Sequence, residues 1–119
     1  MKTRSYQLLV EDIIEAMNKI ERYIKGLTFE AFETNDIVID AVIRNLEIIG
    51  EASKNIPEDA REKHPYIPWK RMIGLRNIAI HEYFGVDLAI IWEIITRNIV
   101  ETKPKIAAML KSFNEEESL

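Results

Sequence analysis

The sequence contains no cysteine, and this absence excludes disulfide bonds, thiolate metal sites and cysteine nucleophiles. Histidine is almost as scarce: His64 and His81 are the two present, 17 residues apart and with no carboxylate nearby at ligand spacing. We therefore expect no metal site within one chain and no cofactor. Four glycines and four prolines among 119 residues are too few for the many tight turns of an all-β sandwich.

Long apolar runs are also missing. The first 17 residues lack the uninterrupted apolar stretch of a signal peptide, and no segment approaches the roughly 18 apolar residues of a membrane span. We expect a soluble, cytoplasmic protein that makes no membrane contact. The net charge of −4 argues against broad, nonspecific binding of nucleic acid, although it leaves room for a local basic cleft.

Apolar side chains at helical spacing are abundant, and at 47% of the chain they are enough to bury a core. The first predicted helix spans residues 4–25 and is ended by Gly26. Thr28 is placed to cap a short helical turn over the next five residues, FEAFE. A second helix starts at Asn35 or Asp36, and Pro57 limits its end.

The second half of the chain predicts two further helices. Residues 57–68 form a connector with one short helical turn, and a third helix runs from Pro68 to about Tyr83, with Gly85 as its stop. Asp87 caps a fourth helix, which Pro104 either kinks or breaks. The sum is an all-α, mostly antiparallel bundle. We expect one domain over residues 1–119, in which 113–119 form a disordered acidic tail.

The second predicted helix carries one narrow polar stripe on an otherwise apolar cylinder. The stripe steps by four and three residues and consists of Asp40, Arg44, Glu47, Glu51 and Lys54. A helix that is apolar over most of its circumference must be covered on more than one side, and a second subunit is one possible cover. The stripe itself is either a solvated ladder of salt bridges or the border of a groove.

Arg76 is the anomaly of the third predicted helix. At 100° per residue it falls within an apolar cluster that contains Trp69, Met72, Ile73, Ala79 and Ile80. An unpaired buried guanidinium would be very costly, so it needs a carboxylate, a partner chain or an anionic ligand. A pair with Glu47 or Glu51 is the structural explanation, and it is compatible with a role in a site.

Asn77 and His81 are four residues apart and share a second strip with Gly74 and Lys70. Gly74 removes bulk there, which permits close approach of another backbone or a ligand. His81 lies in the last turn, where the helix C-terminus favours its protonated form and Arg76 disfavours it. Without other information, a capping or core role is the more common one for a lone histidine, and Tyr83 could simply pack at the helix end.

Together, Arg76, Asn77, His81 and Tyr83 give a pattern, Arg-x4-His-x-Tyr, that resembles the signature of the HepT group of HEPN-domain proteins (higher eukaryotes and prokaryotes nucleotide-binding). The HEPN pattern is an arginine, a polar residue and then a histidine after four to six intervening residues; the tyrosine marks the HepT branch. The segments RNLEIIGEA (44–52) and PWKRMIGLRN (68–77) are similar to that branch as well. The resemblance covers about residues 4–112.

This resemblance implies an antiparallel HEPN bundle of four to five helices, a homodimer, and a metal-independent endoribonuclease that is the toxin of a type II/VII-like toxin–antitoxin pair. The partner would be an MntA-like minimal nucleotidyltransferase antitoxin, which silences the toxin by transferring AMP onto Tyr83. On this interpretation Arg76 and His81 are catalytic and RNA is the substrate. Asn77, Arg44 and Glu51 support them.

Two other hypotheses remain open from the sequence. The chain could be a non-catalytic helical dimer that binds a nucleotidyltransferase or its nucleotide, with the tyrosine as a modification target; the acidic balance favours this to some degree. A plain structural dimer is the third hypothesis. The shared helix side of Arg76 and Tyr83 argues against it, because packing alone does not require a charge there.

Overall fold

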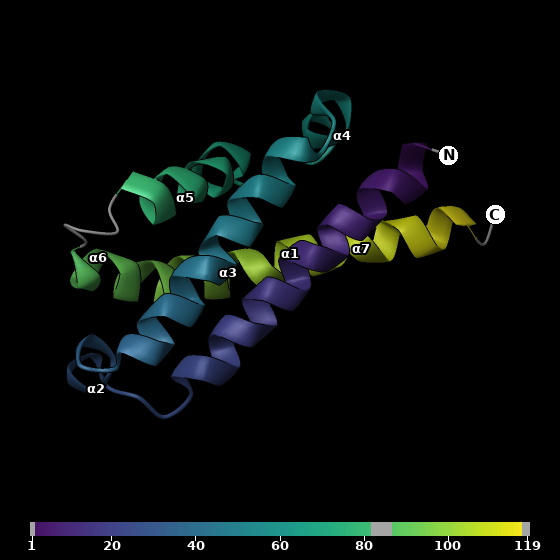
Figure 1. Ribbon diagram of the computed structural model, residues 1–119. Coiled ribbons are helices and arrows are strands. Elements are labelled where there is room, and N and C mark those ends of the chain that lie inside the picture. The colour runs from purple at the N-terminus through teal and green to yellow at the C-terminus, as the bar shows by residue number, and fades with distance from the viewer. Residues whose placement is uncertain (1, 82–86, 118–119) are drawn as a thin grey trace.

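The computed structural model describes residues 2–81 and 87–117, and within these ranges the chain is helical with no strand (Figure 1). Its elements are α1 (Lys2–Ile24), α2 (Phe29–Glu33), α3 (Asp36–Asn55), α4 (Glu58–Glu62), α5 (Trp69–His81), α6 (Leu88–Glu93), the π-helical segment η1 (Ile94–Asn98) and α7 (Ile99–Glu117). The predicted all-α fold is confirmed. None of the helices in these ranges is both long and apolar enough to cross a membrane.

Local signals in the sequence set most of the helix starts. The side chain of Thr28 accepts a hydrogen bond from the Ala31 amide, and Asn35 accepts one from the Val38 amide at 3.1 Å. Asp87 caps α6 through the Ala89 amide at 3.0 Å. These side-chain oxygens satisfy amides that have no partner inside their own helix, so the predicted caps are confirmed.

The C-terminal ends of the helices agree with the prediction where the structure describes them. Gly26 has a φ of +77°, the left-handed conformation that glycine adopts without strain, and α1 ends two residues before it. Pro57 follows the end of α3, and the connector holds one short helix, α4, as predicted. The predicted stop at Gly85 lies outside the described residues.

The long helices pack side by side around one core. In Figure 1, α1 runs back along α3 in the opposite direction, and α7 crosses beneath both. Fully buried side chains from these helices meet in the core, among them Ile13, Met17, Leu46, Ile49 and Ile106. Lys103 of α7 reaches both carboxylate oxygens of Glu21 on α1, at 3.1 and 3.0 Å, which fixes these two helices relative to each other.

The C-terminal helix differs from the prediction in three respects. The chain passes from α6 through η1 into α7, and η1, where the Ile99 amide bonds the Ile94 carbonyl five residues back, was not predicted. Pro104 lies inside α7, so the prediction of a break there is wrong. The helix also continues to Glu117, and Phe113 is buried with its ring 5.3 Å from that of Tyr6. Phe113 therefore belongs to the core and not to a disordered tail.

The connector after α3 determines how α5 enters the bundle. The indole Nε1 of Trp69, the first residue of α5, donates to two backbone carbonyls of the connector, at 3.1 Å to Arg61 and 3.0 Å to His64. The carbonyl of Pro68 accepts the first helical bond, from the Met72 amide. The connector is thus held against the start of α5, which then runs back along α3 (Figure 1).

Candidate active site

The backbones of α3 and α5 lie in close contact at Gly50 and Arg76. Gly50 is buried, and a Cβ atom added to it would lie 2.5 Å from the Arg76 nitrogen and 2.9 Å from the Arg76 Cβ. Those separations are far shorter than van der Waals contact, so no side chain fits at position 50 while the two helices stay in place. Gly50 was not predicted as a site residue, although it stands in the segment RNLEIIGEA. Its physical signal was a glycine in the interior of a helix that is otherwise rich in large apolar residues.

Arg76 pairs with the residue that follows this glycine. Its Nε lies 2.9 Å from Oε2 of Glu51, and the two side chains are 37% and 49% exposed. Of the two carboxylates predicted as partners, Glu51 is the one that makes the contact. The contact is made at Nε, and the guanidinium carries four further N–H donors on its two terminal amino groups.

Arg76 is not buried as the helical wheel suggested. Among residues 69–78, whose side chains the structure describes, the buried ones on α5 are Trp69, Met72 and Leu75, and Leu75 was missed. Ile73, which was assigned to the core cluster, is only half-buried. Arg76 lies between Met72 and Trp69 around the helix, but its long side chain extends from there to solvent and to Glu51 of α3. The cost of burying a charge is avoided in this way.

The structure describes some of the other predicted site residues in and after α5, but not all of them. Asn77 is exposed, and so is Lys70, seven residues earlier and on the same strip of the helix. His81 is the last residue of α5, and its backbone continues the helix that carries Arg76. The side chain of His81 and the whole of Tyr83 lie outside the described residues, so their predicted roles stay predictions.

The polar stripe of α3 faces outward as predicted. Its members, Asp40, Arg44, Glu47, Glu51 and Lys54, are all exposed. Arg44 is seven residues before Glu51, which is roughly 10 Å along the helix axis. Figure 1 shows α5 running back along α3, so residues that precede Glu51 on α3 lie toward the C-terminal end of α5. The structure thus brings Glu51 to Arg76 and places Arg44 two turns further along the same face.

Gly74 makes no close contact with another helix of the described chain, and close approach of a ligand or a second chain there stays a prediction. A Cβ atom added to Gly74 would meet nothing within 4 Å, so the tight contact between helices is made by Gly50 alone of these two glycines. Gly74 instead borders a cavity of about 570 Å³ between α5 and the α6–η1–α7 helix. Its wall is mostly apolar, with Leu75, Ile78 and Ile94 among the lining residues.

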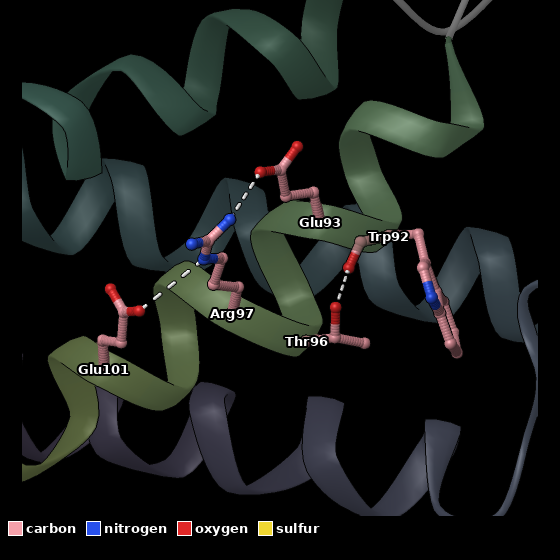
Figure 2. Close-up of polar contacts among 5 residues, drawn as sticks. All are labelled: Trp92, Glu93, Thr96, Arg97 and Glu101. Atoms are coloured by element: carbon pink, nitrogen blue, oxygen red, sulfur yellow. Dashed lines mark hydrogen bonds and ion pairs between the residues drawn. The ribbon is translucent and has the colours of Figure 1, made fainter.

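A second ion-paired arginine bridges two carboxylates that line that cavity. Arg97 bridges Glu93 and Glu101 along one face of the helix, at 3.4 and 3.8 Å, as Figure 2 shows. All three side chains are more than half exposed. In the same turn Thr96 donates to the carbonyl of Trp92 at 2.6 Å. This ladder is a surface feature and offers a comparison for Arg76, which is paired across two helices.

Comparison with known proteins shows the family to which the chain belongs. Residues 13–110 match the family model described as "HepT-like: Ribonuclease HepT-like". The chain belongs to the HepT-like ribonuclease family. The match covers most of the chain, including α3, α5 and the contact between Gly50 and Arg76. The predicted resemblance is therefore confirmed.

Individual members of the HepT-like family agree with this assignment along almost their whole length. A protein of Thermococcus cleftensis named "Probable ribonuclease HepT" is 44% identical over 91% of this chain and 98% of its own. "Putative RNase MJ1380" of Methanocaldococcus jannaschii is 42% identical over 89% of this chain and 97% of its own. "Putative RNase TTE0752" of Caldanaerobacter subterraneus subsp. tengcongensis is 42% identical over 86% and 91%. No solved structure matches the chain.

Proposed function

We propose that this HepT-like chain is a metal-independent endoribonuclease that acts as the toxin of a toxin–antitoxin pair. The observation that carries the proposal is the pair of Arg76 and Glu51. An arginine that is held by a carboxylate at Nε, half-exposed, on the helix that ends in His81, is suited to binding a phosphate. The names of the relatives, "Putative RNase" and "Probable ribonuclease HepT", favour RNA as the source of that phosphate.

The reaction requires no group beyond those of the protein and the RNA. The 2′-oxygen of a ribose attacks the adjacent phosphorus, the bond from phosphorus to the 5′-oxygen breaks, and the products end in a 2′,3′-cyclic phosphate and a 5′-hydroxyl. A base must take the 2′-hydroxyl proton and an acid must give one to the leaving oxygen. We assign His81 to this proton transfer and Asn77 to orienting His81 or the phosphate. Arg76 stabilises the charge on the phosphorane.

Glu51 and Arg44 have separate parts in this proposal. Glu51 holds the guanidinium of Arg76 at Nε, so both terminal amino groups can bind the phosphate in a bidentate manner. Arg44, two turns along the exposed stripe of α3, lines the path of the RNA near the end of α5. Lys70 extends that path in the other direction, since it shares the exposed strip of Asn77. Helix α5 carries Lys70, Arg71 and Arg76 and no acidic residue, which gives an acidic protein a local basic surface.

The reaction needs an acid and a base, and one chain offers one histidine at this end of α5. Two chains that face each other supply two histidines and two arginines, so we propose a homodimer as part of the mechanism. Apolar surface is available for such pairing; Ile37 at the start of α3, for example, is 82% exposed. Light scattering in dilute solution tests this step: a mass of 13.9 kDa would leave the site without its second half.

We further propose that an MntA-like nucleotidyltransferase silences the toxin. The Tyr83 oxygen attacks the α-phosphorus of ATP, the bond to the β-phosphate breaks, pyrophosphate leaves, and the phenol proton passes to a base or to solvent. The product is an AMP anion seven residues from Arg76, where it occupies the guanidinium and repels RNA. Intact mass after incubation with partner and ATP should rise by one AMP. An adduct that persists in Tyr83→Phe would remove Tyr83 from this role.

The experiment for the main proposal is expression of the chain alone. We expect growth arrest and RNA cleavage from the parent, and loss of both in His81→Ala and Arg76→Ala with helical content unchanged. Arg97→Ala is the matched control, because it removes an ion-paired arginine from the exposed ladder of Figure 2 and should arrest growth like the parent. A parent that is verified as unmodified and cleaves no RNA would favour the alternative, a non-catalytic dimer that binds a nucleotidyltransferase.

A further inference from the structure

The interior of α3 contains a glycine whose backbone conformation does not require one. Gly50 has no positive φ, since Gly26 is the glycine with that property among the described residues. Glycine in a helix interior is less favourable than alanine. The reason for Gly50 is therefore space, and the atoms that need the space all belong to Arg76: its nitrogen at 2.5 Å, its Cβ at 2.9 Å and its Cα at 3.1 Å from the added Cβ.

These atoms cannot give way as a flexible side chain would. Two of the three are backbone atoms of α5, and the third is fixed to them. To restore normal contact, a methyl group at position 50 would have to move α5 away from α3 by on the order of 1 Å. Such a shift moves the whole helix, including Arg76 and, at its C-terminal end, His81.

The residue next to Gly50 makes the consequence specific. Glu51 follows it on α3 and reaches Nε of Arg76 at 2.9 Å. The contact at Gly50 sets the separation of the two backbones, and that separation sets whether the carboxylate of Glu51 can reach the guanidinium. Gly50 thus lets the two backbones touch, and Glu51, the next residue, holds the guanidinium of Arg76.

We propose that Gly50 is a positioning residue for Arg76. By admitting the Arg76 backbone against α3, it places the guanidinium where Glu51 holds Nε and where the terminal amino groups face the phosphate. The ribonuclease part of this statement rests on the proposed function. The placement of Arg76 does not, and it can be measured separately.

The test is Gly50→Ala, with two readouts. The first is the ¹⁵N–¹H resonance of Arg76 Nε, assigned by its loss in Arg76→Lys; it should shift or broaden in Gly50→Ala and in Glu51→Gln. The second is single-turnover RNA cleavage well below the melting temperature, which should fall at least tenfold. Gly74→Ala is the control, because a Cβ atom added at Gly74 meets no other atom within 4 Å. It should leave the Arg76 resonance unchanged.

A general loss of stability is separated from positioning by Ile106→Val. This change removes one methyl group from the buried part of α7, so it should lower the melting temperature but alter cleavage less than twofold. If Gly50→Ala does not fold, Glu51→Asp tests the same placement without adding an atom between the helices. Because the aspartate side chain is shorter, its carboxylate should no longer reach Nε of Arg76. We expect the Arg76 resonance to move from its parent position and RNA cleavage to fall together.

The outcomes distinguish the two claims. An Arg76 resonance that is unchanged in Gly50→Ala, or a Glu51→Asp variant that keeps the parent resonance, overturns the positioning role. A resonance that moves in Gly50→Ala, in a parent that cleaves no RNA, supports the positioning role and contradicts the ribonuclease. A resonance that moves together with a tenfold loss of cleavage supports both.

Discussion

Arg76 of α5 and Glu51 of α3 form an ion pair with 2.9 Å between Nε and Oε2, directly beside the point where Gly50 lets the two helices touch. Both side chains remain accessible to solvent, at 37% and 49%. Pairs of this exposure contribute little to stability, generally under about 1 kcal/mol. The ion pair of Arg76 and Glu51 therefore matters for geometry, because it fixes the orientation of the guanidinium on the exposed side of the two helices.

The first prediction concerns this anchor. Glu51→Gln keeps the size of the side chain and removes its charge, so the guanidinium of Arg76 loses its ionic partner. We expect RNA cleavage to fall about tenfold, which corresponds to ~1.4 kcal/mol of transition-state stabilisation, while the melting temperature changes little. Single-turnover cleavage and thermal denaturation measure the two effects. Glu93→Gln removes a carboxylate from the Arg97 ladder instead and should leave cleavage intact; equal losses in both variants would refute a specific anchor.

The second prediction concerns Lys70 as a phosphate contact. Lys70→Ala should weaken RNA binding, and because one counterion-releasing contact is lost, the slope of log Kd against log salt should fall by about 0.7. Fluorescence titration at several salt concentrations, in a His81→Ala background that prevents cleavage, measures this slope. Lys111→Ala, an exposed lysine on α7, is the control. A slope that changes as much in the control as in Lys70→Ala would exclude α5 as the RNA path.

The third prediction concerns the connector before α5. Trp69→Phe keeps an aromatic ring but removes the indole N–H that bonds the carbonyls of Arg61 and His64. We expect a loss of about 1–2 kcal/mol in the free energy of unfolding, measured by chemical denaturation. Trp92→Phe is the matched control, since Trp92 contacts the Phe32 ring and its indole N–H makes no hydrogen bond in the described part of the chain. A Trp69→Phe variant no less stable than Trp92→Phe would mean that the connector is held by other contacts.

The fourth prediction concerns Pro104 in the interior of α7. Proline has no N–H to donate to the carbonyl of Val100, four residues earlier, and its ring crowds that carbonyl. Pro104→Ala should therefore raise the free energy of unfolding by about 1–3 kcal/mol. Pro57→Ala serves as the comparison, because Pro57 precedes α4 where its missing N–H costs no helical bond. No gain, or a loss, in Pro104→Ala would show that α7 is adapted to the proline.

Much of the fold could be predicted because its signals are local. Thr28, Asn35 and Asp87 each cap a helix by accepting a hydrogen bond from an amide no more than three residues away. The spacing of apolar residues likewise predicts which face of each helix is buried. The polar stripe of α3 was predicted for the same reason. The carboxylate partner of Arg76 was narrowed to two residues one turn apart on α3, and packing selected Glu51.

The remaining features depend on tertiary contacts that no local pattern contains. The need for glycine at position 50 follows only from the approach of a second helix. The π-helical segment at Ile94–Asn98 and the continuation of α7 through Pro104 likewise have no signal in the local pattern. Phe113 was assigned to a tail because acidic residues follow it, but its ring fills a place in the core beside Tyr6.

The most direct test of the central claim is the analysis of RNA ends after incubation with the purified, unmodified protein in excess EDTA. The proposal that Arg76 and His81 cleave RNA through the 2′-oxygen predicts fragments that end in a 2′,3′-cyclic phosphate and begin with a 5′-hydroxyl. These fragments should decrease at least a hundredfold in Arg76→Ala and in His81→Ala. Intact RNA, or fragments with 3′-hydroxyl and 5′-phosphate ends, would contradict it.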